Sequence, residues 1–196
     1  MKTFLRHAFA GILFLGGIGL FGEACKAAAP DQPLLGLRLE EAQQTDFFVF
    51  FHMEETSREE DSDNRLVVNF RPQSEAMAKV VRLRATLDKA GKISVMSLVL
   101  SRSFVDEDNS ELFPNDITKS MLIDSLPLSD RKGIIPLSRE IKNNKQLSDY
   151  SSLAYQTYLG KTDKYSLSFP NSSVLLQNID KDGDHWLLIQ VSKRKE

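Results

Sequence analysis

Residues 79–105 read KVVRLRATLDKAGKISVMSLVLSRSFV, and the architecture of the chain follows from this stretch. Apolar and polar side chains alternate from Val80 to Leu87, the two-residue period of a strand with one buried face. Residues 93–100 are β-rich and apolar on both sides from Met96 onward, which predicts a central strand covered on both faces. The short segment 89–92 contains a glycine and suits a hairpin turn. We therefore expect a sheet built around an antiparallel hairpin.

Other segments carry further strand patterns. Strands are expected at residues 46–53, 66–70, 165–170, 173–177 and 185–192. The first contains the aromatic run Phe47–Phe51, which is apolar on both sides and also demands cover on two faces. Residues 54–64 are polar and acidic. We interpret them as a solvated loop between two strands, rather than as a surface for a cation or a basic partner.

Helical signals are fewer. A helix is expected between Phe113 and Pro127, where apolar side chains recur every four residues. Residues 147–158 place apolar and aromatic side chains on one helical face, with Gly160 as a C-cap, although a strand is an alternative. Residues 128–144 have a poor pattern and predict a long irregular connection, with a short helix near its end as an option.

Length and composition bound the fold class. The chain has 196 residues, of which 41% are hydrophobic and 27% charged, as in ordinary soluble domains. We predict a single α+β domain over residues 46–196. It should hold a mostly antiparallel sheet of about five to seven strands, packed with about two or three helices.

The N-terminus has the pattern of an export signal. Lys2 and Arg6 precede an apolar run over residues 8–21, and alanines follow at residues 27–29. The run is shorter than the ~18 apolar residues that a membrane-spanning helix needs. We predict a secretory signal peptide over residues 1–27, and then a tether over residues 28–45 whose Leu-rich part could dock as a short helix or turn.

Cys25 offers a second interpretation of the same segment. It is the only cysteine of the chain and follows the apolar run, as in a lipoprotein signal over residues 1–24 that ends with a lipidated Cys25. Ala24 fits that pattern, whereas Glu23 and Gly22 do not. Either interpretation predicts an exported protein, periplasmic or lipid-anchored to the cell envelope, with contact to the membrane only through this segment. The folded domain then lacks cysteine and any disulfide.

The sequence argues against several chemistries. The chain carries 25 basic and 27 acidic residues, a balance that does not favour nucleic acid as a partner. The acidic segment 180–184 lacks the glycine position and the closing glutamate of an EF-hand calcium loop, so we interpret it as a hairpin turn. His52 and His185 remain after signal removal, without a G-x-S-x-G motif. We therefore assign no catalytic, cofactor-binding or metal-binding residue.

Arg82 and Arg84 are the candidate binding residues. They point from the same face of a predicted strand, and Arg102 is expected on a neighbouring strand, so the three could hold an anionic ligand. The alternative is a row of solvent-facing cations paired with local carboxylates.

Two functional hypotheses follow. The first is a non-enzymatic envelope protein, a binding or assembly module for another protein or a small-molecule ligand. The second is an exported hydrolase with a dispersed active site that uses His185 or His52. Substitution of both histidines separates the two hypotheses.

Overall fold

The structure is a computed structural model that describes residues 32–106, 113–143, 153–181 and 183–194. Its centre is a seven-stranded antiparallel sheet. The strands are β1 (Met53–Glu60), β2 (Leu66–Pro72), β3 (Val81–Leu87), β4 (Ile93–Ser101), β5 (Lys164–Ser168), β6 (Ser172–Lys181) and β7 (Asp184–Lys193). The helices are α1 (Leu39–Ala42), α2 (Asp46–Phe50), α3 (Glu75–Ala78), α4 (Arg102–Asp106), α5 (Phe113–Ser125), α6 (Leu128–Asn143) and α7 (Leu153–Tyr158). The predicted α+β class with a single domain is confirmed.

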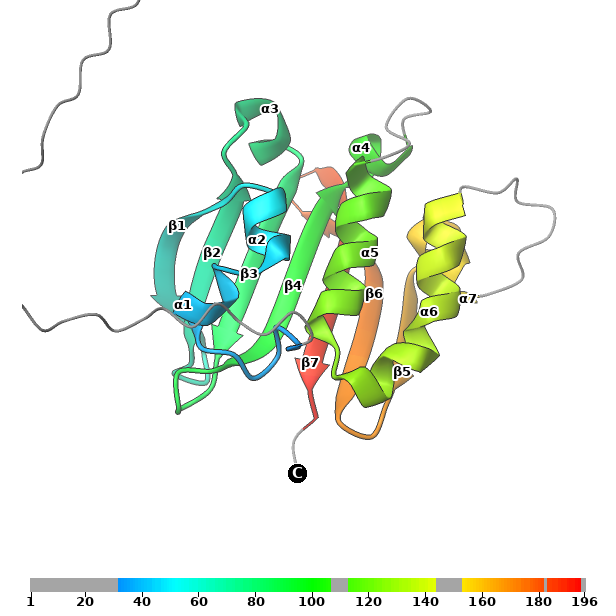
Figure 1. Ribbon diagram of the computed structural model, residues 1–196. Coiled ribbons are helices and arrows are strands. Elements are labelled where there is room, and N and C mark those ends of the chain that lie inside the picture. Colours follow the sequence, from blue (N-terminus) through cyan, green and yellow to red (C-terminus); the bar gives the residue numbers. More distant parts are fainter. Residues whose placement is uncertain (1–31, 107–112, 144–152, 182, 195–196) are drawn as a thin grey trace, which may run out of the picture.

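Two meanders share the sheet, whose strand order is β1-β2-β3-β4-β7-β6-β5. The first meander runs from β1 to β4, and the helices α4 to α7 follow it along the chain. The second runs from β5 to β7 and returns so that β7 pairs with β4 in the middle of the sheet (Figure 1). The two halves of the chain therefore meet along one pair of strands.

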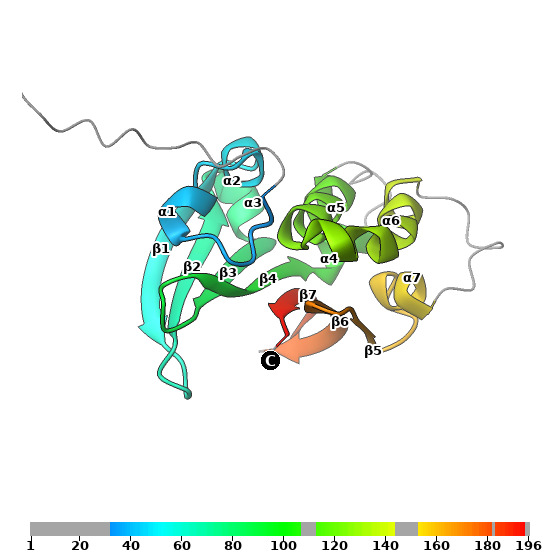
Figure 2. The ribbon, with the colours of Figure 1, turned by 60° about the horizontal axis from the view of Figure 1, so that its bottom comes forward.

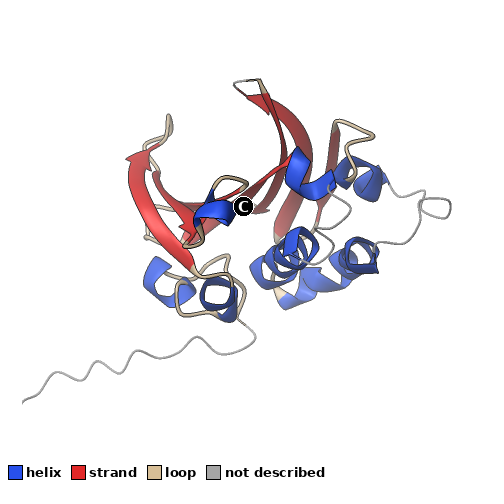
Figure 3. Cartoon of the chain, turned by 90° about the horizontal axis from the view of Figure 1, so that it is seen from above, coloured by secondary structure: helices blue, strands red, loops and turns tan. Residues whose placement is uncertain are grey.

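One face of the sheet is covered by helices. A row of apolar residues that lie directly opposite one another crosses five strands, and each is buried: Phe70, Leu83, Leu98, Ile189 and Leu176. Helix α5 presents Ile117, Met121 and Leu122, all fully buried, to the same core. Helices α1, α2, α5 and α6 lie on one side of the sheet (Figure 2), and the sheet arches so that its concave side faces away from them (Figure 3).

The predicted hairpin of β3 and β4 is confirmed. Leu83 lies opposite Leu98, and Val81 lies opposite Leu100. The Asp88 carboxylate closes the turn by accepting hydrogen bonds from the backbone N–H groups of Ala90 and Lys92, both at 2.9 Å. Local pattern and turn chemistry agree at this hairpin, so the sequence specified it.

The aromatic run forms helix α2, and the predicted strand over residues 46–53 is wrong. Phe47, Phe48 and Phe51 are buried, whereas Val49 is 59% and Phe50 70% exposed. This burial pattern follows a helix, because a strand would place residues 47, 49 and 51 on one face. The ring of Phe48 packs on Phe70 with centroids 5.1 Å apart.

The first strand comes later than predicted. Residues 53–60 form β1 at the edge of the sheet, although residues 54–64 were expected to form an acidic loop. Most of its side chains are exposed, which explains the polar sequence. An edge strand with charged side chains and a bulge between Glu55 and Ser57 resists pairing with other chains.

The irregular connection predicted over residues 128–144 is also wrong, because Leu128–Asn143 forms helix α6. Asp130, Ile134 and Leu137 are buried at helical spacing. Gly133 permits close packing, since a Cβ there would lie 2.3 Å from Cε1 of Phe169. Tertiary packing overrides the weak local propensity of this segment.

Two other helix predictions fare better. The helix expected between Phe113 and Pro127 is α5. Within the expected 147–158 helix, Leu153–Tyr158 forms α7, and Gly160 follows it with a φ of +73°. Residues 144–152 lie outside the described part of the chain.

Part of the expected tether packs into the domain. Leu34, Leu37 and Leu39 are buried in the core. The N–H of Leu34 donates to the backbone oxygen of Asp124 at the end of α5, at 2.8 Å. The export segment 1–27, including Cys25, lies outside the described residues. Among the helices that are described, none is long and apolar enough to cross a membrane.

Candidate functional site

The uncovered face of the sheet carries a row of polar side chains, which we call the polar row. The register places its members directly opposite one another on five neighbouring strands: Ser57, Asn69, Arg84, Ser97 and Gln190. The strand period of two puts these residues on the face opposite the apolar core row. The same alternation that builds the core thus also builds a continuous polar surface.

Two hollows lie on this concave face. One has a volume of about 1080 Å³ and the other of about 740 Å³. Both are lined by Arg84, Ser97 and Gln190, so they meet at the polar row. Together they form a trough over β3, β4 and β7.

Arg82 reaches across the floor of the smaller hollow. Its guanidinium carbon lies 4.6 Å from the ring centroid of Trp186, which is a cation–π contact. Arg82 belongs to β3 and Trp186 to β7, so the side chain crosses β4, where Val99 lies opposite Arg82. Among the described residues, Arg82 forms no ion pair with a carboxylate.

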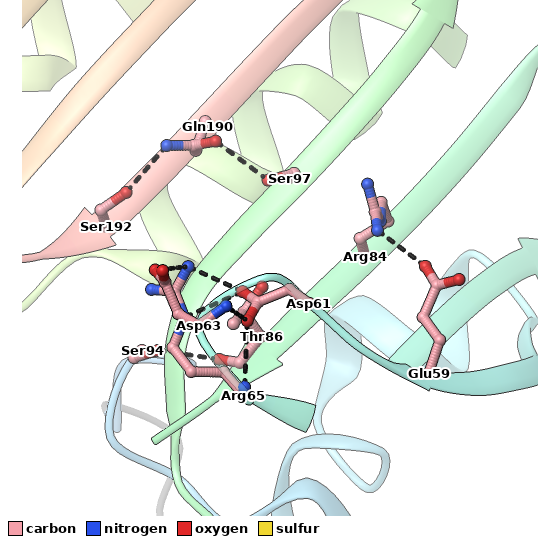
Figure 4. Close-up of polar contacts among 10 residues, drawn as sticks. All are labelled: Glu59, Asp61, Asp63, Arg65, Arg84, Thr86, Ser94, Ser97, Gln190 and Ser192. Atoms are coloured by element: carbon pink, nitrogen blue, oxygen red, sulfur yellow. Dashed lines mark hydrogen bonds and ion pairs between the residues drawn. The ribbon is translucent and has the colours of Figure 1, made fainter. Parts of the chain in front are cut away.

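Arg84 is held by an ion pair with the edge strand. Its Nη2 lies 2.8 Å from Oε1 of Glu59, and both side chains are about half exposed, at 48% and 53% (Figure 4). The amide of Asn69 donates to the same Glu59 oxygen at 3.2 Å. Further along the polar row, the Gln190 amide donates to Oγ of Ser192 at 3.1 Å. The central residues of the trough thus hold one another through a small number of polar contacts.

Aliphatic side chains flank the polar row on the same face. Val99 on β4 lies opposite Leu188 on β7, and Trp186 lies opposite Ile179 on β6. Val99, Leu188 and Ile179 are half-buried although no helix covers them. The structure thus lacks the second cover that the apolar character of residues 96–100 predicted, at least in the part of the chain it describes.

The trough is electropositive in a chain that is slightly acidic overall. Eight basic side chains line the two hollows: Arg65, Arg71, Arg82, Arg84, Lys89, Lys181, Lys193 and Arg194. Four acidic ones accompany them: Glu59, Asp61, Asp63 and Asp88. The whole chain has 25 basic against 27 acidic residues. The excess of cations is therefore local to this face.

Arg102 is not part of this surface, contrary to the sequence interpretation. It begins helix α4 and is buried. Its Nη1 donates to the backbone oxygen of Tyr158 at 2.6 Å, and Nη2 forms an ion pair with Asp106. Arg102 ties α4 to the end of α7, so its role is structural.

The two histidines lie apart from the trough. His52 is exposed, with a φ of +48°, between α2 and β1. His185 is exposed on the β6–β7 hairpin, and its Nδ1 lies 2.5 Å from Oδ1 of Asp180. Within the described ranges, no group of three or more histidine, cysteine or acidic residues could hold a metal ion.

A third hollow, of about 510 Å³, lies beside helix α2 on the helical side. The exposed Val49 and Phe50 line it together with Asp46, Asp116 and Asp124. Burial raises the pKa of the Asp124 carboxyl, and the neighbouring Asp46 adds to the effect. This hollow is smaller than either hollow of the trough, and its described lining holds one basic side chain, Lys119.

Comparisons with known proteins suggest no function for this chain. The chain matches no family model, and neither the curated proteins nor the solved structures yielded a match.

Sequence reasoning placed Arg82 and Arg84 on one face but missed the rest of the trough. Trp186 and Gln190 join it only because β7 pairs with β4, about 90 residues away along the chain. A signal was present in the sequence, since Gln190 and Ser192 alternate with the apolar Ile189 and Val191 along the last strand. That alternation predicts which side chains share a face of the strand, but it does not predict which strand pairs with it.

Proposed function

We propose that the protein is an exported, non-enzymatic binding module whose ligand occupies the open trough of the sheet. The observation that carries this proposal is the concave sheet face, on which arginines, amides, a tryptophan and half-buried aliphatic side chains converge. Ligand sites are typically concave, mostly apolar and supplied with a small number of placed polar groups.

The proposal explains why apolar side chains are kept on an uncovered face. A sheet face that only meets water would carry polar residues at Val99, Leu188 and Ile179. Their retention beside Arg82 and Arg84 favours a surface that is covered when a ligand binds. Export rests on the basic, apolar and small-residue order of residues 1–29.

Ligand titrations followed by amide NMR test the binding site. The panel should include organic acids, sugars, nucleotides, amphiphiles and short peptides. For a ligand that binds, we expect the shifted signals to gather on β3, β4 and β7, and Ser97→Trp to abolish binding because it fills the junction of the two hollows. Ser103→Trp, on the exposed side of α4, is the matched control and should bind normally. Shifts confined to the helices would contradict the proposal.

The histidines test the rival hydrolase. If an ester or glycoside substrate is turned over and the His52→Ala/His185→Ala variant loses this activity, the non-enzymatic assignment is wrong. Separately, mass analysis of the mature N-terminus distinguishes cleavage after Ala27 from lipidation of Cys25. An intact precursor in the cytosol would contradict export.

A further inference from the structure

We infer that the trough binds an anionic amphiphile, a single molecule with an acid group and an aliphatic chain. Arg82 and Arg84 bind the acid group, and the strip formed by Val99, Leu188 and Ile179 receives the chain. This inference rests on the proposed function and names the ligand class for the same site.

The cation–π contact prepares Arg82 for an acid group. The contact with the Trp186 ring restrains the guanidinium of Arg82, and a contact of this kind leaves N–H donors for hydrogen bonding. Arg82 lines the smaller hollow and forms no ion pair within the described part of the chain, so its N–H donors are available to a ligand there. A carboxylate or phosphate can accept two parallel hydrogen bonds from such a fork.

Arg84 supplies a second cation on the same face. It lies two residues further along β3, so both side chains rise from one side of the strand. Its partner Glu59 is half exposed, and exposed ion pairs contribute little to stability. An incoming acid group can therefore replace Glu59 at modest cost. Lys181 lines the same hollow and adds positive charge.

The aliphatic strip accounts for the rest of the ligand. Val99 and Leu188 lie opposite each other, and Ile179 follows beside Trp186. Their exposed area is removed from water when an alkyl chain lies on them. A hollow of about 740 Å³ suits one small ligand. An inorganic anion would leave the strip uncovered, and a neutral lipid would leave the Arg82 guanidinium without an anionic partner.

Trp186 is the only tryptophan of the chain, so its fluorescence reports directly on the site. The purified protein is titrated below micellar concentrations with decyl phosphate, inorganic phosphate and decyl maltoside. We expect decyl phosphate to change the Trp186 emission saturably, with a Kd at least about tenfold lower than that of either other probe. Far-UV circular dichroism must stay unchanged, which shows that the probe binds the folded protein.

Variants separate the two halves of the site. Arg82→Gln should weaken decyl phosphate binding by about tenfold or more, because the charged fork is lost. Val99→Ser should weaken decyl phosphate binding but leave the response to inorganic phosphate unchanged. Lys132→Gln, which removes an exposed cation from α6, should bind as the wild type does.

The outcomes distinguish this inference from the proposed function. If inorganic phosphate or decyl maltoside binds with the same affinity as decyl phosphate, the inference that the ligand is an anionic amphiphile is wrong. Unchanged binding by Arg82→Gln overturns it as well. If instead a neutral ligand shifts the β3, β4 and β7 signals and Ser97→Trp blocks it, only the ligand class fails. If the Ser97→Trp variant still binds every ligand that the wild type binds, the trough is not the binding site.

Discussion

Asp130 is a buried carboxylate, 1% exposed, that links helix α6 to the start of β6. It accepts a hydrogen bond from Oγ of Ser172 at 2.7 Å and one from the backbone N–H of Asn171 at 3.3 Å. We predict that Asp130→Ala lowers the free energy of unfolding by about 2–3 kcal/mol, because it leaves buried donors unpaired. Urea denaturation measures the loss. The exposed Asp163→Ala should change stability by less than about 0.5 kcal/mol, and a similarly small effect at Asp130 would contradict the prediction.

Tyr158 couples stability to alkaline pH. Its hydroxyl donates to Oδ1 of Asn115 at 2.6 Å, and burial raises the pKa of the phenol. A raised pKa means that folding favours the protonated phenol. This contribution is complete below the unfolded pKa of about 10 and is lost as the pH rises above it.

We therefore predict that the free energy of unfolding falls from about pH 10 upward, and that Tyr158→Phe makes this fall shallower. At pH 7 the same variant should cost about 1 kcal/mol, because one buried hydrogen bond is lost. Denaturation curves at a series of pH values measure both effects. Tyr165→Phe, in the edge strand β5, is the control. An equally steep fall in the Tyr158→Phe variant would contradict the assignment.

At the level of elements, the end of α7 depends on a glycine. Gly160 and Gly91 both have a φ of +73°, but a Cβ at Gly160 would lie 2.9 Å from Nη2 of Arg102, whereas Gly91 has open space around it. Gly91→Ala should cost about 1 kcal/mol from backbone strain alone. Gly160→Ala should cost more, since Arg102 must also shift. Comparing the unfolding midpoints of the two variants isolates the cost of moving Arg102. Equal losses of stability would show that moving Arg102 adds no cost.

The charged side chains of the edge strand β1 protect the sheet edge from pairing with other molecules. Glu55 and Arg58 form an ion pair at 2.7 Å, and Glu60 is exposed on the same strand. We predict that replacing these three residues by valine makes the protein self-associate, because it creates an apolar strand edge. Sedimentation at micromolar concentrations measures this. The same number of valines at the exposed residues Glu75, Lys132 and Lys161, none of which lies in a strand, should leave the protein as monodisperse as the wild type.

The elements that sequence predicted well have agreeing local signals. In β3 and β4, alternation, strand propensity and a glycine turn all indicate a hairpin. The predictions failed where composition and periodicity disagree: the phenylalanines of α2 favour a strand by propensity, yet their burial follows a helix. In α6, Gly133 looks like a helix breaker but provides room for Phe169. The site was only half predictable, because Arg82 meets Trp186 through a strand pairing that no local pattern encodes.

The whole molecule is joined by the pairing of β4 with β7. Seven residue pairs from Val95↔Ser192 to Ser101↔Trp186 connect the two meanders, and α5 packs across both strands. We predict one cooperative unfolding transition, with circular dichroism and Trp186 fluorescence giving coincident midpoints. Deleting residues 164–194 should prevent folding, because it exposes the edge of β4 and removes two of the five residues of the apolar core row. Separate transitions, or a folded fragment, would contradict this.

The hydrogen bond from Leu34 to the end of α5 also sets how an attached molecule is presented. The described chain enters the domain on the helical side, so an attachment at that end leaves the trough on the opposite face open to a ligand.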